Sequence, residues 1–143
     1  IISKKNLRSL ISFSEKTWPL EACALLEGER LENKDLLTVK VTKLHFAKNV
    51  ANFPEKEFEV DPKKLLFLHR ELRGGSTCLI GIWHSHPNGS ASLSETDLLR
   101  VNDPMLVWLL TPVVESKALK TLAFKIEDDF GDYVFKAIDI ESI

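Results

Sequence analysis

The continuous apolar run from Thr77 to Trp83 constrains the fold of this chain more than any other segment. A run of this length without polar alternation is typical of a strand that is covered on both faces in the centre of a sheet. Gly74-Gly75 before it and Pro87 after it are turn and stop signals. The chain therefore has to build a sheet around this strand and cover both of its faces.

The other segments carry helix and strand patterns that follow one another without a regular βαβ alternation. Apolar spacing and capping residues predict helices over 3–16, 61–73 and 94–102. Strands are predicted over 21–26, 36–46, 58–60, 105–110, 119–126 and 133–140, with a turn after Gly28 and loops over 29–35, 48–57, 84–93 and 128–132. We therefore expect an α+β fold with a mostly antiparallel or mixed sheet.

Size, charge and cysteine usage exclude several classes of protein. The 143 residues fit one domain, 1–143, and the 19 Lys and Arg against 21 Asp and Glu give a net charge of −2. This balance favours neither nucleic acid nor an anionic membrane surface as a partner, and no apolar run approaches the roughly 18 residues of a membrane span. Cys23 and Cys78 cannot form a disulfide framework or an all-cysteine zinc site, and their usage suits a reducing cytoplasm.

His84 and His86 follow the apolar strand directly. If the strand continues to them, both imidazoles leave the same face with Cβ atoms about 6.5–7 Å apart. Two imidazoles at that separation can converge on one metal ion with bonds of about 2.0–2.1 Å. Asp97 returns ten or so residues later, in the first turn of the next predicted helix. Two His and one carboxylate with an open fourth position are typical of a catalytic zinc site.

Each part of this constellation also has a simpler interpretation. A lone His-x-His pair is weak evidence for a metal, and Ser94-x-x-Asp97 is also a capping box, in which the Asp97 carboxylate would bond the Ser94 amide instead of an ion. Two His and a carboxylate also form the triad of non-haem iron oxygenases, which usually place the carboxylate beside the first His. Zinc deaminase chemistry is disfavoured because the Pro-Cys-x-x-Cys half of that signature is missing.

Several other residues are expected to have structural roles only. We expect Trp83 on the strand face opposite His84, and His45 and His69 at surface or half-buried positions. The remaining tryptophans and both cysteines are expected in the core, namely Trp18, Trp108, Cys23 and Cys78.

The joint pattern resembles the signature of the JAMM, or MPN-plus, zinc metalloproteases. Pro19-Leu20-Glu21-Ala22-Cys23 precedes His84-x-His86, seven residues and Ser94-x-x-Asp97, with Gly81-Ile82-Trp83 before the His pair. The resemblance extends over about residues 7–110. Ala24 and Leu93 depart from the family, where many members carry Gly and Pro, but neither departure removes a functional group.

The resemblance implies an MPN fold, a curved sheet flanked by helices with cytidine-deaminase-like layering and zinc at the sheet edge. It implies one zinc ion per chain, held by His84, His86 and Asp97. Zinc lowers the pKa of its water towards ~7 and polarises a carbonyl. Glu21 would then be the general acid/base and the Ser94 hydroxyl a donor to the oxyanion. Glu27 is the nearest competitor of Glu21, but its spacing from the preceding proline does not match.

Similar proteins include deubiquitinases and short prokaryotic proteases that act on ubiquitin-like or sulfur-carrier proteins, and the short chain resembles the prokaryotic kind. The resemblance therefore implies a peptidase or isopeptidase that cleaves after the C-terminal tail of such a protein. Asn49 and Asn52 are expected to bind the tail backbone, although an ordinary solvated loop explains them equally well. The alternative function is an inactive MPN-type interaction scaffold, and a homodimer is left open.

Overall fold

The computed structural model describes residues 1–33 and 36–143. Within them the elements are, in order, α1 (Lys4–Thr17), β1 (Cys23–Asn33), β2 (Leu36–Ala47), α2 (Pro62–Leu72), β3 (Cys78–His86), α3 (Glu95–Leu99), β4 (Val107–Val114), β5 (Lys117–Ala118), β6 (Leu122–Asp129) and β7 (Asp132–Ile138). Part of the loop predicted over 29–35 lies outside the described residues. None of the described helices has the length and apolar character needed to cross a membrane.

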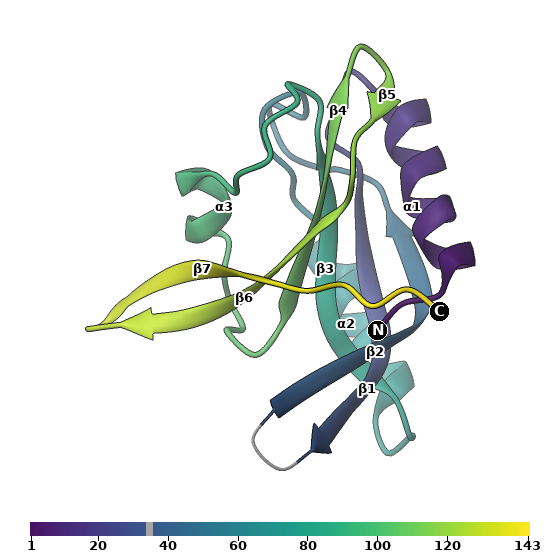
Figure 1. Ribbon diagram of the computed structural model, residues 1–143, viewed down its shortest axis with the longest axis vertical. Helices are drawn as coiled ribbons and strands as arrows, with labels where there is room; N and C mark the ends of the chain where they lie inside the picture. The colour runs from purple at the N-terminus through teal and green to yellow at the C-terminus, as the bar shows by residue number, and fades with distance from the viewer. Residues whose placement is uncertain (34–35) are drawn as a thin grey trace.

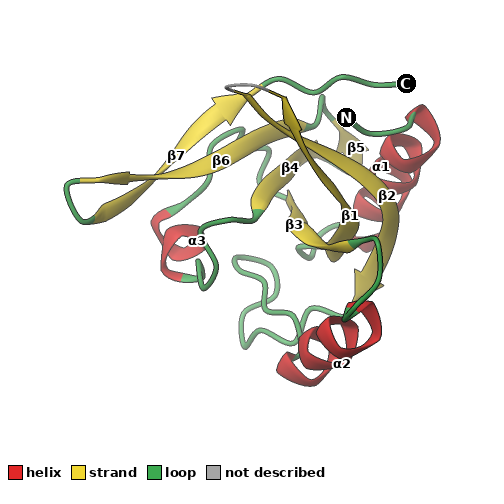
Figure 2. Ribbon diagram, turned by 90° about the horizontal axis from the view of Figure 1, so that it is seen from below, coloured by secondary structure: helices red, strands yellow, loops and turns green. Residues whose placement is uncertain are grey.

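The strands form one curved sheet in the order β2-β1-β3-β4-β6-β7, and the short β5 pairs with β4. The β3/β4 pair is parallel and the other neighbours are antiparallel. α1 lies on one side of the sheet, whereas α2 and α3 lie on the other (Figures 1 and 2). The expected α+β class, with a curved mixed sheet flanked by helices, is confirmed.

β3 is the central strand that the apolar run predicts, because β1 and β4 flank it and residues on both of its faces are buried. Trp83 packs with Leu10 of α1 in the cluster on one side of the sheet. On the other side, Leu79 packs with Leu68 of α2. β3 therefore joins the two halves of the core.

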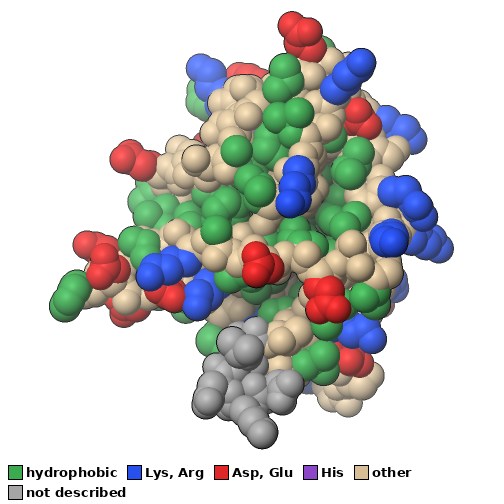
Figure 3. Space-filling model, in the orientation of Figure 1, with side chains coloured by type: hydrophobic (Ala, Val, Ile, Leu, Met, Phe, Trp, Pro, Cys, Tyr) green, Lys and Arg blue, Asp and Glu red, His purple; other side chains and the backbone are tan. Residues whose placement is uncertain are grey.

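α1 follows the predicted pattern closely. The Ser3 side chain caps it by accepting a hydrogen bond from the Asn6 N–H at 3.0 Å, and Leu10 and Ser14 are its buried residues. Its outer face is polar, and Lys and Arg side chains gather along the α1 edge of the face shown in Figure 3, while acidic side chains are scattered over the rest.

The predicted turn after Gly28 is wrong, since β1 continues through this residue to Asn33. The pairing of β1 with β2 shifts register here, between Glu27 and Gly28. A Cβ atom on Gly28 would lie 1.9 Å from the backbone oxygen of Lys40, so the glycine serves a close approach of two strands rather than a turn.

Strand boundaries also differ from the predictions near the site. β3 extends to His86 instead of ending at Trp83, and β4 extends to Val114. These extensions pair with each other, with His86 opposite Pro112, so each strand end stabilises its neighbour. The strand predicted over 58–60 is reduced to one bridge between Asn49 and Val60.

Two residues expected in the core are at the surface. Trp18, just beyond α1, is 37% exposed and donates its indole N–H to the Pro87 oxygen at 3.2 Å. Cys78 is exposed because it begins β3 directly after an exposed loop. Cys23 and Trp108 are buried as expected.

Candidate metal centre

The extension of β3 brings His84 and His86 to the end of a buried strand. Both side chains leave the same face, as the strand period requires, and their Nε2 atoms lie 3.1 Å apart. His84 is completely buried, with its ring stacked on Phe58 at a centroid distance of 4.4 Å and edge-on to Trp108 at 5.7 Å. Trp83 lies on the opposite face, as expected.

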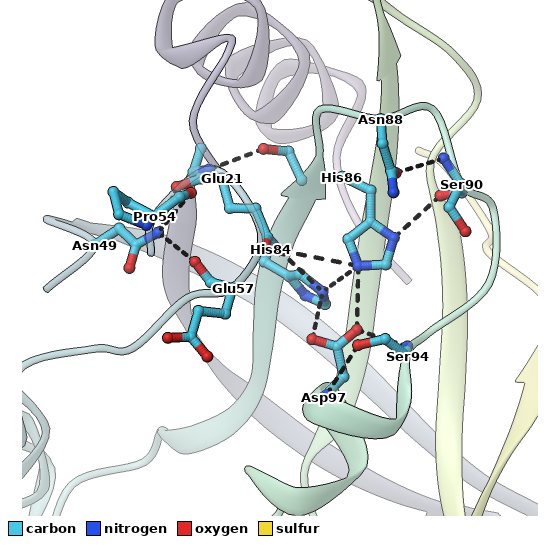
Figure 4. A network of polar contacts seen from close by, with 12 residues as sticks. Glu21, Asn49, Pro54, Glu57, His84, His86, Asn88, Ser90, Ser94 and Asp97 are labelled. Atoms are coloured by element: carbon cyan, nitrogen blue, oxygen red, sulfur yellow. Dashed lines mark hydrogen bonds and ion pairs between the residues drawn. The ribbon is translucent and has the colours of Figure 1, made fainter. Parts of the chain in front are cut away.

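Asp97 reaches the two imidazoles from the first turn of α3. Its Oδ1 lies 3.3 Å from the Nε2 of His84, and its Oδ2 lies 3.1 Å from the Nε2 of His86 (Figure 4). The capping box is also present: Oδ2 accepts the Ser94 N–H at 2.8 Å, while the Ser94 Oγ accepts the Asp97 N–H at 3.0 Å. From the sequence, capping of α3 and binding of a metal are competing roles for Asp97. In the structure the Asp97 carboxylate accepts the capping hydrogen bond and also faces both histidines.

Glu21 approaches the same point from the segment that precedes β1. Its side chain is 2% exposed, and Oε1 lies 4.0 Å from the Nε2 of His84 and 3.9 Å from that of His86. The neighbouring Ala22 is tied to β3, because its N–H donates to the Ser85 Oγ at 2.9 Å and its oxygen accepts the Ser85 N–H at 3.0 Å. Residues far apart in the sequence thus converge at one end of the sheet.

The donor atoms fit a metal ion of the zinc type. The imidazole and carboxylate atoms lie 3.1–3.3 Å apart, close to the ~3.3 Å expected between tetrahedral ligands with bonds of about 2.0–2.1 Å. All four side chains, Glu21 included, offer atoms within 4.8 Å of one another. Among the described residues, the buried Glu21 Oε1 has no hydrogen-bond partner, which is costly unless an ion, water or substrate provides one. Glu21, His84, His86 and Asp97 therefore form a candidate metal-binding site.

The surroundings shift the pKa values of these side chains in different directions. Burial and the nearby carboxylates of Asp97 and Glu57 raise the pKa of Glu21 to about 8. Burial raises the pKa of Asp97, but the contacts with His84 and His86 and the hydrogen bond from the Ser94 N–H outweigh it and hold this pKa far below the ordinary value. Burial also lowers the pKa of His84. An anionic Asp97 beside a neutral imidazole is the form in which these residues bind a cation.

A backbone oxygen fixes the orientation of the His86 ring. The Nδ1 of His86 lies 3.2 Å from the Ser90 oxygen. A backbone oxygen can only accept, so this nitrogen carries the proton and leaves the Nε2 lone pair directed at the site. The Ser90 N–H in turn donates to the Asn88 Oδ1 at 3.0 Å. Sequence reasoning missed Ser85 and Ser90, since nothing in their local pattern distinguishes them from loop serines.

The remaining predicted site residues are distributed as follows. Ser94 lies beside Asp97. Asn49 lies beside the backbone of Glu21, with its amide engaged by backbone groups, and Asn52 is exposed on the same loop. Glu27 lies elsewhere, bonded to His45 at 2.6 Å, so this competitor does not reach the candidate metal centre.

Comparison with known proteins agrees with this geometry. The sequence profile of the prokaryotic homologs of the JAB domain matches residues 3–125. A desampylase of Haloferax volcanii is 32% identical over 92 residues, which cover 64% of this chain and 62% of that protein. The chain thus spans less than two thirds of the length of this relative.

Solved structures agree on the fold. A protein from Desulfitobacterium hafniense superposes with a TM-score of 0.75 at 24% identity, covering 99% of this chain and 92% of that one. A JAB1/MPN domain protein from Archaeoglobus fulgidus superposes with a TM-score of 0.59 at 19% identity, covering 99% and 97%. With its profile match, its fold and its Glu-His-His-Asp centre, the chain belongs to the prokaryotic JAB family, within the JAMM/MPN group.

Proposed function

We propose that this chain is a zinc-dependent JAMM-type hydrolase, a peptidase or isopeptidase that cleaves after the C-terminal tail of a ubiquitin-like or sulfur-carrier protein. The observation that carries the proposal is the convergence of Glu21, His84, His86 and Asp97 in one buried centre. The relative named a desampylase supports a ubiquitin-like modifier as the substrate class.

In the proposed reaction His84, His86 and Asp97 hold one zinc ion, and Glu21 remains beside it. Zinc, when bound, supplies Lewis acidity that lowers the pKa of water and polarises the scissile carbonyl. Glu21 accepts the proton of the attacking water at its carboxylate and gives it to the leaving nitrogen. The position of Oε1, 3.9–4.0 Å from both Nε2 atoms, supports this role because it is near the donor set but outside its closest spacing.

Ser94 and the loop over 48–57 provide the proposed contacts with substrate. The Ser94 Oγ accepts a hydrogen bond from Asp97, so its own hydrogen is available to donate to the developing oxyanion. The exposed Asn52 is proposed to bind the tail backbone. A tail that ends in Gly-Gly suits a narrow passage, because side chains would obstruct it.

The experiment combines metal analysis with cleavage assays. Purified protein should contain about one zinc ion per chain, and should cleave a ubiquitin-like fusion after its Gly-Gly tail. The comparison substrates are the same fusion with bulky residues in place of the two glycines, and an unrelated unfolded peptide. Equal cleavage of all three would indicate a generic peptidase. No cleavage by zinc-loaded protein would instead favour the scaffold alternative.

A further inference from the structure

The side-chain amide of Asn49 holds the backbone of Glu21. Its Nδ2 donates to the Glu21 oxygen at 3.0 Å and to the Glu57 oxygen at 2.9 Å, with a longer contact of 3.4 Å to the Pro54 oxygen (Figure 4). One amide group therefore joins the residue that carries the proposed acid/base to two points of the loop that follows β2.

The other end of the same amide is also engaged. Its Oδ1 accepts hydrogen bonds from the N–H groups of Ala51 at 3.1 Å and Glu59 at 3.0 Å. Asn49 thus closes the loop on itself, from residue 51 to residue 59, while bonding Glu21. An asparagine side chain has two donor hydrogens and one acceptor oxygen, and these contacts use both kinds.

Glu21 depends on this loop because it precedes the sheet. β1 begins at Cys23, and the Glu21 N–H donates to the Pro54 oxygen at 2.7 Å. Both backbone polar groups of Glu21 are therefore held by the 49–59 loop, whereas the next residue, Ala22, is bonded to β3 through Ser85. The placement of the Glu21 carboxylate over the histidines follows from the loop that Asn49 organises.

We infer that Asn49 is a positioning residue for Glu21, and not the contact to the substrate tail that its sequence context suggested. This inference rests on the proposed function for its catalytic consequence, but its structural part stands on the hydrogen bonds alone. Asn49 acts through Glu21: it sets the distance between the carboxylate and the donor set, and it leaves the ligands His84, His86 and Asp97 untouched.

Asn49→Asp is the most informative variant. It keeps an acceptor for the Ala51 and Glu59 amides but replaces the donating group by a carboxylate, which repels the Glu21 and Glu57 oxygens. Asn49→Ser, whose hydroxyl donates and accepts one bond each, is the conservative companion should the Asp variant fold poorly. Asn102→Asp makes the same chemical change at an exposed position and serves as the control.

Kinetics separate positioning from substrate contact. We expect Asn49→Asp to lower kcat by about 10–100-fold with KM within twofold of wild type and zinc content unchanged. We expect the kcat of Asn49→Ser to lie between that of wild type and that of Asn49→Asp. In a Glu21→Gln background Asn49→Asp should cause no further loss, because both changes act on one group. A raised KM with unchanged kcat, or an effect of equal size in the Glu21→Gln background, would overturn the inference.

A readout independent of activity distinguishes failure of the inference from failure of the proposed function. In the zinc-loaded protein, residue-resolved amide exchange should be at least tenfold faster at Glu21 in Asn49→Asp than in wild type, and unchanged at His84 and His86. Asn102→Asp should match wild type throughout. If wild type does not hydrolyse any substrate, the proposed function fails while this exchange result still decides the positioning. Equal exchange at Glu21 in wild type and Asn49→Asp would refute it.

Discussion

Two glutamates of one chain segment, Glu21 and Glu27, face histidines of neighbouring strands with opposite results. Glu27 is bonded to His45 at 2.6 Å and to the Thr77 hydroxyl at 2.7 Å, so both of its oxygens have partners. Glu21 is almost fully buried, and its Oε1 has no hydrogen-bond partner among the described residues. The protein itself provides hydrogen-bond partners for both oxygens of the Glu27 carboxylate, whereas one oxygen of Glu21 is available to a metal ion, water or substrate.

The same contrast appears in their protonation. Burial raises the pKa of Glu21 to about 8, helped by the charges of Asp97 and Glu57. For Glu27 burial acts in the same direction, but the hydrogen bonds from Thr77 and His45 outweigh it and lower the pKa. A Glu–His pair in a sheet is therefore no evidence of function by itself. What distinguishes the candidate active site is that the unpartnered carboxylate oxygen of Glu21 lies beside three further side chains that can bind a metal.

The largest expected effect follows from removing a proposed ligand. His86→Ala should reduce zinc from about one ion per chain to near zero. It should reduce turnover by at least about 10³-fold, since a catalytic metal contributes several kcal/mol and 1.4 kcal/mol is tenfold. His45→Ala, which removes the histidine of the other pair, should keep its zinc. Metal analysis of both purified variants checks this, and full zinc retention by His86→Ala would exclude the proposed site.

Glu21→Gln should keep zinc and lose about 10²–10⁴-fold in turnover, because the amide keeps its shape but cannot carry a proton. Glu27→Gln makes the same change in the pair of Glu27 and His45, and this variant should hydrolyse substrate at close to the wild-type rate. Steady-state kinetics on zinc-loaded proteins measure both. Wild-type turnover by Glu21→Gln would remove the acid/base assignment and leave the metal site intact.

Ser94→Ala should show two separable losses. Because the capping box is present, stability should fall by about 1 kcal/mol. If the hydroxyl also binds the oxyanion, turnover should fall by roughly 10²–10³-fold at unchanged zinc content. Thermal unfolding and kinetics on the same preparation separate the effects. A lowered melting temperature with intact turnover would leave Ser94 only its cap.

The sequence was sufficient for those parts of the site that depend on local spacing. His84 and His86 share a face because the strand period places them there, and Asp97 returns because Ser94 begins a helix three residues earlier. The position of Glu21 beside them rested on the resemblance to a family, since no local rule connects residue 21 with residue 84.

The errors lie where contacts between distant segments decide the outcome. Gly28 resembles a turn signal, and only the approach of Lys40 from the next strand shows its purpose. Trp18 has a large apolar side chain of the kind found in cores, yet it lies beyond the end of α1 and donates a hydrogen bond to the Pro87 oxygen at the surface. The hydrogen bonds of Asn49 are equally invisible in the sequence, because its partners are backbone groups whose positions depend on the folded loop.

The smallest expected effect concerns stability in the absence of metal, where the two glutamates should respond to pH with opposite signs. The folded state raises the pKa of Glu21 from 4.5 to about 8, so its stabilising contribution is complete below pH 4.5 and is lost as the pH rises towards 8. The folded state lowers the pKa of Glu27, so its contribution is present above pH 4.5 and is lost as the pH falls through the folded value.

Neutral glutamine should therefore stabilise the metal-free protein at one position and destabilise it at the other. At pH 8 Glu21→Gln should raise the free energy of unfolding by more than about 1 kcal/mol, since one pKa unit corresponds to about 1.4 kcal/mol. Glu27→Gln should lower it by about 1 kcal/mol or less, as expected for the loss of partly solvated hydrogen bonds to a carboxylate. Denaturant unfolding with a chelator, at pH 8 and again near pH 4.5, measures both, and the Glu21→Gln gain should shrink at the lower pH. A Glu21→Gln variant less stable than wild type at pH 8 would mean that the fold stabilises the charged Glu21 carboxylate, as it does that of Glu27.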